Sequence, residues 1–369
     1  MKNQNHSILI VTPSFDGGGA EKIAVNLANQ FSVEGIDVTL LVVRPEGPYR
    51  EQVNELVKIV DLNCISSVQS LFRVFFAIKK FKPTNILSVI RDTNIFVGLS
   101  RIFLDVKCVV YREANTLDHI YGSVWYKRWV WYSLMRISYA RANSLIANSK
   151  GTCEHLLESK IVNRKKLSII DNPVLPIDVD RLLSSKIEDE WLLDPNIKVV
   201  LNVGRLHPAK NQRLLIRAFS EVLKKRPDVR LIILGEGSEE DNLVHAAKEE
   251  GVLDYFKIIQ FQSNPFPYYK NADVFVLSSN YEGFGNVLVE ALSSGNPVIS
   301  TNCPGGPKSI LADGKFGVLV EPGNSREMAD AIIDVLEGRI TFDKFSLIMR
   351  SREYRVDTIS KKYWSLFEK

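Results

Sequence analysis

Glu282 and Glu290 are the residues of this sequence whose types and spacing most clearly suggest chemistry. The first carboxylate follows the apolar run 274–277, and the second lies within the first turns of the helix expected next. Between them Gly283 and Gly285 let the backbone approach a ligand closely, and the free N–H groups of a helix start suit diphosphate or hydroxyl oxygens. The segment therefore predicts a binding loop, although a glycine turn with a capping acid would have the same composition.

A second loop brings two cations to the start of a helix. Gly204, Arg205 and Lys210 follow the apolar run 199–203, and an amphipathic helix is expected over 211–225. Two cations beside the positive end of a helix dipole suit a diphosphate, although surface cations are more often simply solvated. A third loop, again between a strand and a helix, holds Gly235, Glu236 and Gly237.

A glycine-rich loop also follows the first apolar run, Ser7–Thr12, and contains Gly18 and Gly19. A dinucleotide fingerprint would need a third glycine where Lys22 stands. It would also need an acidic residue at the end of the second strand, where the chain has Val43. A nicotinamide or flavin enzyme is therefore disfavoured.

Strands and helices must position these loops, and short apolar runs alternate with amphipathic stretches along nearly the whole chain. This alternation is typical of parallel sheets covered by helices on both faces. The expected strands are Ser7–Thr12, 37–43, 86–89, 108–111, 144–147, 167–170, 199–203, 229–234, 274–277, 297–300 and 317–320. A polar stretch without clear periodicity after Pro173 divides them into two series. We therefore expect an α/β protein of two doubly wound, Rossmann-like domains facing a cleft, with ligands at the carboxyl ends of the strands.

The composition is that of an ordinary globular protein and excludes several classes. The 369 residues are 45% apolar and 24% charged, and this length suits two domains. No apolar stretch is long enough to cross a bilayer, and the four scattered cysteines predict neither a zinc site nor a disulfide framework. A net charge of +4 does not indicate a nucleic-acid partner, but residues 1–175 carry 22 basic and 15 acidic side chains and are therefore basic.

Taken together, the motifs resemble those of the retaining glycosyltransferases of family GT4 over essentially the whole chain. The resemblance rests on Gly-Gly-Ala-Glu near the start, Asn-Pro at the linker, the Gly-Arg-Leu loop with its lysine, Gly-Glu-Gly, Glu-x7-Glu and Cys-Pro-Gly-Gly-Pro. It implies the GT-B fold, with an acceptor-binding domain over 1–172 and a nucleotide-sugar-binding domain over 173–353. It further implies a final helix, 354–369, that crosses back to the first domain, and no need for a metal or other cofactor.

The resemblance also implies roles for individual residues. Arg205 and Lys210 would bind the donor diphosphate and stabilise the charge of the leaving group. Glu290 would accept hydrogen bonds from the ribose, and Glu282 would lie beside the donor sugar. The other donor-binding residues implied are Gly18, Gly19, Gly204, Gly235, Glu236, Gly237, Gly283, Phe284, Gly285 and Asn286. Transfer would proceed with retention, by front-face attack through an oxocarbenium-like state.

One position departs from the family pattern. Many relatives carry a histidine near the donor sugar on the loop after the strand 108–111, where this chain has Arg112, Glu113 and Asn115. Either Glu113 or Asn115 takes part of that role, or His119 reaches in. Glu113 therefore joins the catalytic candidates.

Two stretches of the basic half mix cations with aromatic side chains. Residues 71–82 are expected to form mostly a core helix with a basic end. Residues 125–132 hold three of the five tryptophans and adjacent cations, a combination typical of surfaces that bind anionic membranes. We therefore predict an acceptor or membrane face formed by Arg112, Asn115, His119, Trp125, Lys127, Arg128 and Trp129.

The function indicated is transfer of a hexose or N-acetylhexosamine from a UDP-sugar to a lipid-linked or growing surface glycan, such as a capsule, O-antigen or lipopolysaccharide. The enzyme would be cytoplasmic and peripheral on the inner face of the plasma membrane. Two alternatives stay open. One is a UDP-N-acetylglucosamine 2-epimerase with the same fold, and the other is a non-catalytic sugar-nucleotide-binding subunit, which the missing histidine suggests.

Overall fold

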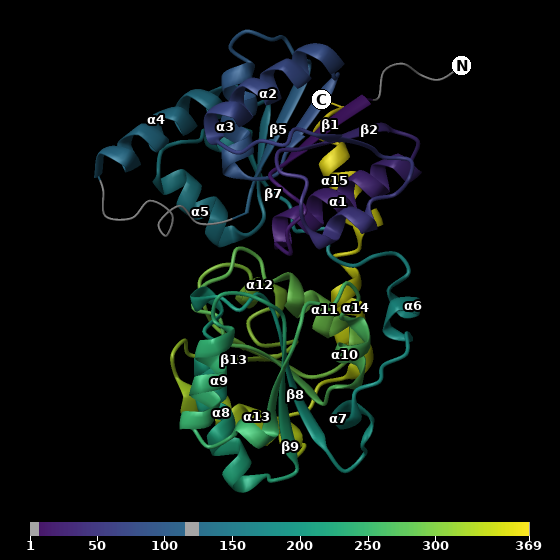
Figure 1. Ribbon diagram of the computed structural model, residues 1–369, viewed down its shortest axis with the longest axis vertical. Helices are drawn as coiled ribbons and strands as arrows, with labels where there is room; N and C mark the ends of the chain where they lie inside the picture. The colour runs from purple at the N-terminus through teal and green to yellow at the C-terminus, as the bar shows by residue number, and fades with distance from the viewer. Residues whose placement is uncertain (1–6, 115–124, 369) are drawn as a thin grey trace. The chain divides into compact units, whose positions relative to one another are not determined.

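The computed structural model describes residues 7–114 and 125–368, and the side chains of all of these except 125–128. The chain divides into two compact units (Figure 1). Unit 1 comprises Met1–Val174 and Val356–Lys369, and unit 2 comprises Leu175–Arg355. The domain limits expected from the sequence lie two residues away from these.

Unit 1 is built on a seven-stranded parallel sheet in the order β3-β2-β1-β4-β5-β6-β7. Its strands are β1 (Ser7–Thr12), β2 (Asp37–Val42), β3 (Lys58–Asp61), β4 (Asn85–Ser88), β5 (Cys108–Glu113), β6 (Ser144–Ala147) and β7 (Leu167–Ile169). Its helices are α1 (Gly19–Val33), α2 (Ser67–Phe81), α3 (Arg91–Ser100), α4 (Trp125–Ala140), α5 (Lys150–Glu158) and α15 (Val356–Trp364), with 3₁₀ turns at Pro48–Gln52 and Arg164–Lys166. The order reverses between β1 and β4, which pair with each other at the centre of the sheet.

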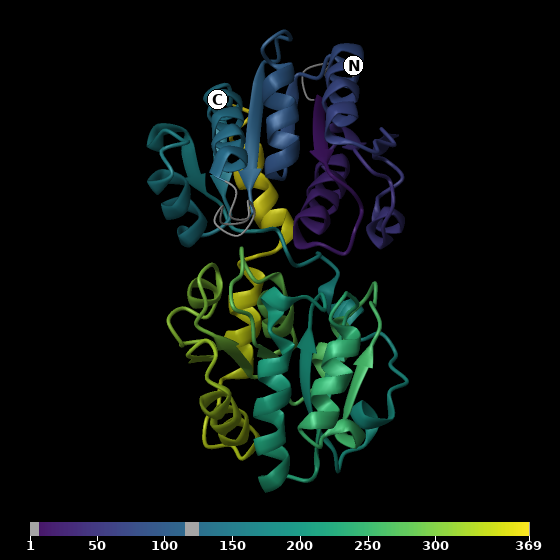
Figure 2. The same cartoon turned by 60° about the vertical axis from the view of Figure 1, so that its left-hand side comes forward.

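Helix α15 completes unit 1 although it comes from the far end of the chain. Figures 1 and 2 both show it, in yellow, beside the elements of the first half. It packs on α1, where the ring of Phe31 meets that of Trp364 edge-on at 5.4 Å between centroids. The core on the α2–α4 side includes Val74, Phe96 and Met135. Unit 1 is therefore assembled from both parts of the chain.

Unit 2 is built on a six-stranded parallel sheet in the order β10-β9-β8-β11-β12-β13. Its strands are β8 (Lys198–Val203), β9 (Val229–Leu234), β10 (Phe256–Ile259), β11 (Val274–Leu277), β12 (Val298–Thr301) and β13 (Val318–Val320). Its helices are α6 (Val179–Leu183), α7 (Glu190–Leu193), α8 (Gln212–Lys225), α9 (Glu240–Glu249), α10 (Phe266–Asn271), α11 (Asn286–Ser294), α12 (Pro307–Ile310), α13 (Ser325–Leu336) and α14 (Lys344–Arg352), with 3₁₀ turns at Pro208–Lys210 and Leu253–Tyr255. Here the order reverses between β8 and β11.

Two groups of helices cover this second sheet. Helices α8, α9 and α13 pack together over a core that includes Leu215, Leu243 and Ile332, all of them buried. Helix α11 instead packs on α10 and α14. The amphipathic pattern expected over 211–225 is therefore confirmed as α8.

The predicted α/β class with two parallel sheets is confirmed, and most predicted strands lie within two residues of an observed one. The apolar pattern of the sequence does not predict β3 and β10. Each is an edge strand with one neighbour and mostly half-buried residues, so its apolar run is weak. Strand β5 continues two residues beyond the predicted 108–111. Over residues 7–114 and 125–368, no helix combines the length and apolar character that a membrane span requires.

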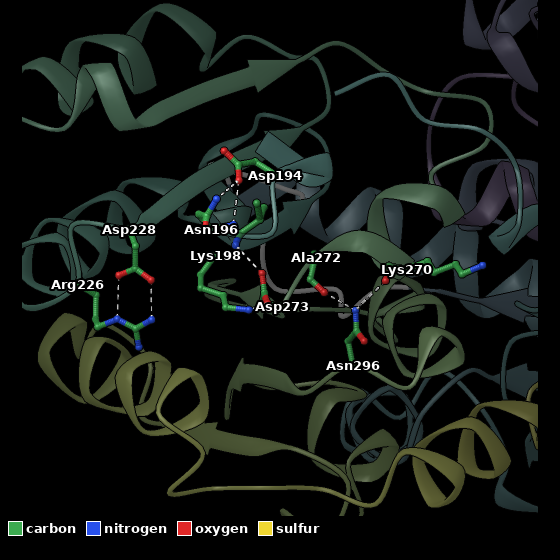
Figure 3. A network of polar contacts seen from close by, with 10 residues as sticks. Asp194, Asn196, Lys198, Arg226, Asp228, Lys270, Ala272, Asp273 and Asn296 are labelled. Atoms are coloured by element: carbon green, nitrogen blue, oxygen red, sulfur yellow. Dashed lines mark hydrogen bonds and ion pairs between the residues drawn. The ribbon is translucent and has the colours of Figure 1, made fainter. Parts of the chain in front are cut away.

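A polar network supports unit 2 at the amino ends of its strands (Figure 3). The carboxylate of Asp273, just before β11, accepts hydrogen bonds from Lys198 Nζ at 2.9 Å and from the Val199 amide at 2.8 Å. Just before β9, Arg226 binds Asp228 through Nε and Nη2, at 2.9 and 2.6 Å. The hydrogen bonds from Arg226 hold the pKa of Asp228 below its usual value.

We predict that Asp228→Asn weakens unit 2 at neutral pH. Because the folded-state pKa of Asp228 is lowered, its contribution to stability is present above the unfolded value of about 4 and is lost as pH falls through the folded value. The variant should lose about 0.5–1 kcal/mol of unfolding free energy at neutral pH. Urea unfolding across a pH series should show that difference vanishing in acid.

Asp330→Asn is the matched control for this measurement. Asp330 lies 3.7 Å from Lys225 in a pair that is more than half exposed, so its removal should change the free energy of unfolding little. Equal losses in the two variants would contradict the role given to Asp228.

Candidate active site

The reversal of strand order in unit 2 marks where a ligand should bind. Parallel strands on the two sides of such a reversal send their helices to opposite faces of the sheet, which leaves a crevice at their carboxyl ends. Here β8 leads to α8 and β11 leads to α11, and these helices belong to the two different groups that cover the sheet. The loops after β8 and β11 are those that the sequence singles out through Arg205, Lys210 and Glu282.

An ion pair joins these two loops. Lys210 Nζ lies 2.5 Å from Glu282 Oε1, and the same oxygen accepts a hydrogen bond from Ser279 Oγ at 2.6 Å. The side chain of Glu282 is 8% exposed, whereas that of Lys210 is 26% exposed. Burial, with the Glu282 charge adding to it, raises the pKa of nearby Cys303 to about 12, so its thiol stays neutral. The carboxylate is therefore fixed in the interior, and the cation remains accessible.

Arg205 is the second cation of the loop after β8, and its side chain is exposed. Its guanidinium makes no hydrogen bond or ion pair with the part of the chain that the structure describes. Its carbonyl oxygen accepts a hydrogen bond from Gln212 Nε2 at 3.1 Å. The backbone of Arg205 is thus held while its charge is available to an anion.

Gly235 and Gly237, in the loop after β9, pack closely against the backbone of the loop after β8. A Cβ atom at Gly235 would lie 2.0 Å from the Gly204 carbonyl oxygen, and one at Gly237 would lie 2.2 Å from that of Leu206. The amide of Leu206 also donates to the Glu236 carbonyl oxygen at 2.8 Å. Only glycines allow this approach, so the loop after β9 fixes the loop that carries Arg205. Contact of these residues with a nucleotide base stays a prediction.

The backbone around Glu282 is held in the same way by Gly305 and Gly306, which are not among the predicted site residues. A Cβ atom at Gly305 would lie 1.7 Å from the Glu282 carbonyl oxygen, and one at Gly306 would lie 1.9 Å from that of Phe284. The amide of Glu282 donates to the Pro304 carbonyl oxygen at 3.0 Å. Their signal in the sequence is the Cys-Pro-Gly-Gly-Pro segment after β12.

The start of α11 offers backbone donors beside Glu282. The amides of Gly283, Phe284 and Gly285 make no hydrogen bond to other described residues, and Asn286 is the first residue of the helix. The Phe284 ring is buried against Tyr354 at 5.7 Å between centroids. Phe284 can therefore reach a ligand through its backbone but not through its ring.

Glu290 lies further along α11 and is buried. Its Oε2 accepts a hydrogen bond from the Tyr269 hydroxyl at 3.0 Å. Tyr269 and Ser279 are not predicted from the sequence, because neither belongs to a recognisable motif. The two glutamates of the Glu-x7-Glu segment therefore have separate partners in the structure.

Comparison with known proteins identifies the family. A profile described as Glycosyltransferase Family 4 matches residues 17–176, and one described as Glycosyl transferases group 1 matches residues 184–352. This chain belongs to glycosyltransferase family 4. It is therefore a glycosyltransferase.

Two relatives of this glycosyltransferase align with most of its length. A Campylobacter jejuni protein named N-acetylgalactosamine-N,N'-diacetylbacillosaminyl-diphospho-undecaprenol 4-alpha-N-acetylgalactosaminyltransferase is 29% identical over 335 residues, which cover 88% of each chain. A Rhizobium meliloti lipopolysaccharide core biosynthesis glycosyltransferase, LpsE, is 27% identical over 86% of each chain.

Solved structures show that this glycosyltransferase has the GT-B fold. Anabaena HepE in complex with UDP-glucose matches with a TM-score of 0.79 at 20% identity, covering 98% of this chain and 99% of that one. WaaG, a glycosyltransferase involved in lipopolysaccharide biosynthesis, matches with a TM-score of 0.73 at 15% identity, covering 98% and 97%. The predicted pair of Rossmann-like domains is thus confirmed.

In unit 1 of this glycosyltransferase, Gly18 and Gly19 form the junction between the loop after β1 and helix α1. Gly18 precedes the helix in an extended conformation, and α1 begins at Gly19. A Cβ atom at Gly18 would lie 2.2 Å from a carboxylate oxygen of Glu21. Strand β1 borders the strand reversal of unit 1, so both glycines lie at the carboxyl edge of its sheet, and their contact with a donor stays a prediction.

The prediction that Arg112 belongs to an acceptor or membrane face at the surface is wrong. Arg112 is fully buried, its Nη2 donates to Asn172 Oδ1 at 2.6 Å, and its Nη1 donates to the Val89 carbonyl oxygen at 3.2 Å. The physical reason is that β5 continues to Glu113, so Arg112 pairs with Ile146 of β6 inside the sheet. Arg112 is therefore an interior residue that holds Asn172 at the end of unit 1.

Glu113 is also buried, with interior partners. Tyr139 donates a hydrogen bond from its hydroxyl to Glu113 Oε1, and Asn94 Nδ2 donates to the same oxygen at 3.0 Å. Burial raises the pKa of Glu113, against the opposing effect of these hydrogen bonds. The structure thus accounts for Glu113 through contacts within unit 1, and a catalytic role stays a prediction.

The remaining residues of the predicted acceptor or membrane face are only partly described. Asn115 and His119 lie outside the described residues. Trp125, Lys127 and Arg128 belong to the first turn of α4, with side chains outside the described part. Trp129 follows them on the helix and is exposed.

We predict that Gly305→Ala destabilises this glycosyltransferase and impairs its activity. The added methyl would displace the Glu282 backbone. Gly305 also has φ +123°, a backbone conformation that residues with a side chain rarely adopt. The free energy of unfolding should fall by about 2–4 kcal/mol, which a lower melting temperature would report. Gly323→Ala is the control. Gly323 has φ +83° with open space around it, so this substitution adds backbone strain without a steric contact. Equal losses would show that the contact with Glu282 is unimportant.

Proposed function

We propose that this glycosyltransferase moves a hexose or N-acetylhexosamine from a UDP-sugar to a lipid-linked or growing surface glycan. The observation that carries the proposal is the Lys210–Glu282 pair at the strand reversal of unit 2. Beside it lies the exposed guanidinium of Arg205, which has no partner among the described residues. The choice of donor is supported by HepE, which was solved with UDP-glucose.

The two cations and the helix start account for donor binding in this proposal. Arg205 and Lys210 bind the diphosphate. The amides of 283–285, which donate to no other described residue, bind it as well. When a diphosphate approaches, Lys210 exchanges part of its contact with Glu282 for phosphate oxygens. Glu282 then lies beside the donor sugar, where its carboxylate can accept hydrogen bonds from hydroxyl groups.

The chemical step proceeds with retention and without a metal. The bond between the anomeric carbon and the diphosphate oxygen breaks, and the acceptor oxygen forms its bond to the same face of that carbon. The departing phosphate takes the acceptor proton. Arg205 and Lys210 neutralise the charge that develops on the UDP, which is the role a metal ion has in other transferases.

The acceptor and location are proposed from the relatives. The name of the Campylobacter protein contains a diphospho-undecaprenol acceptor, and the Rhizobium protein is named for lipopolysaccharide core biosynthesis. An acceptor of that kind is held in a membrane. The enzyme therefore works peripherally on the inner face of the plasma membrane.

We predict that Arg205→Ala and Glu282→Ala each lower UDP release from the preferred UDP-sugar by about 100-fold or more, because each removes a charge at the donor. UDP release is measured for a panel of UDP-sugars, with and without a lipid-linked acceptor. Arg213→Ala is the matched control, since Arg213 is an exposed cation of α8 paired with Glu249. UDP release by Arg205→Ala or Glu282→Ala equal to that of the wild type would refute the site assignment.

We also predict that EDTA leaves the rate unchanged and that the product has the same anomeric configuration as the donor. Arg205 and Lys210 already supply positive charge to the leaving group, so a chelator removes nothing the reaction needs. Proton NMR of the isolated product gives the configuration. Loss of activity in EDTA that Mg²⁺ or Mn²⁺ restores would disprove metal independence, and an inverted product would disprove retention.

A further inference from the structure

Helix α2 has apolar side chains on two opposite sides. Ser70, Val74, Ala77 and Ile78 are buried against unit 1. Val68, Phe72 and Phe76 recur every fourth residue and lie along the other side, where each is more than half exposed. A helix of a globular protein normally turns charged and polar residues toward water. The outer side of α2 is therefore suited to contact something other than water.

Neighbouring residues extend this apolar side. Ile65, just before the helix, is 95% exposed, and Phe103, just after α3, is 78% exposed. The ring of Phe75 connects Phe76 to Phe103, because its centroid lies 5.5 Å from that of Phe76 and 6.4 Å from that of Phe103. We name the surface formed by Ile65, Val68, Phe72, Phe76 and Phe103 the α2 face. Three of its five residues lie on α2, which packs beside α3 in Figure 1.

The chain segment that contains α2 carries charged side chains of one sign only. Residues 62–91 contain no aspartate or glutamate and five basic residues. Arg73, Lys79 and Lys80 lie on α2 itself and are exposed, and Lys82 follows directly. Long cationic side chains at the edge of an apolar surface can reach anionic groups while the apolar part is buried.

We infer that the α2 face docks on the surface of a membrane that contains anionic phospholipids. Its phenylalanines would enter the boundary between headgroups and acyl chains, and its cations would contact lipid phosphates. A second copy of the chain is a poorer partner, since it would bring two cationic edges together. The inference rests on the proposed membrane location, but it places the contact on α2 and not on residues 125–132.

Cosedimentation with vesicles tests the inference on the full chain. The wild type should bind vesicles of phosphatidylcholine mixed with phosphatidylglycerol and should bind phosphatidylcholine alone much more weakly. Phe72→Ser/Phe76→Ser should lower binding to the mixed vesicles by at least about tenfold. Lys79→Glu/Lys80→Glu should also lower it and should make the remaining binding less sensitive to salt.

Two controls separate the α2 face from other surfaces. Phe345→Ser removes a side chain of unit 2 that is 68% exposed, and Trp129→Ser removes the exposed tryptophan of α4. Both variants should bind vesicles like the wild type. Thermal unfolding checks that each variant is folded, and all substituted side chains are exposed.

The outcomes distinguish this inference from the proposed transfer reaction. UDP release with a water-soluble acceptor should be unchanged in Phe72→Ser/Phe76→Ser, so loss of vesicle binding with intact turnover supports the α2 face. Absence of wild-type binding to the anionic vesicles would overturn the inference, and so would wild-type levels of vesicle binding by Phe72→Ser/Phe76→Ser. Loss of binding in Trp129→Ser alone would move the contact to α4. A dimer in gel filtration that the double variant disperses would assign the face to self-association.

Discussion

The reversal of strand order at the centre of each sheet is the constraint on which the rest of this protein depends. Right-handed crossovers oblige the chain to place helices on opposite faces on the two sides of the reversal, so the loops that leave the central strands diverge. In unit 2 the loop after β8 and the loop after β11 are far apart in sequence but begin on adjacent strands. The bond between Lys210 and Glu282 spans that boundary. The charges of the site are therefore brought together by topology and not by any local motif.

Close backbone contacts then fix the loops that carry these charges. The loop after β9 lies against the loop after β8, and the loop after β12 lies against the loop after β11. Each contact uses a glycine at the point of closest approach, Gly235 in one case and Gly305 in the other. Charged side chains held by such a backbone lose little freedom when a ligand binds, because their supports are already ordered.

Much of this arrangement can be predicted from the sequence because its signals are local. Apolar runs mark the strands, and cations, acids and glycines directly after them mark the loops at the carboxyl edge. Arg112 was predicted wrongly because the end of β5 depends on pairing with β6, which no local pattern reveals. Ser279 and Tyr269 carry no motif, and their roles follow only from where Glu282 and Glu290 lie. The exposed Phe72 and Phe76 resemble core residues in sequence, because apolar spacing does not say which sides of a helix are covered.

The discontinuity of unit 1 has a consequence for biosynthesis. Leu175–Arg355 is a continuous segment and can fold as soon as it has left the ribosome. Unit 1 lacks α15 until all of that segment has been translated. The α1 surface around Phe31 therefore stays uncovered by Trp364 while unit 2 is being synthesised. During that interval the nascent first half exposes apolar surface that the finished protein covers. Early termination within unit 2 would therefore leave both units incomplete. Unit 1 is the first unit to be synthesised in part and the last to be completed.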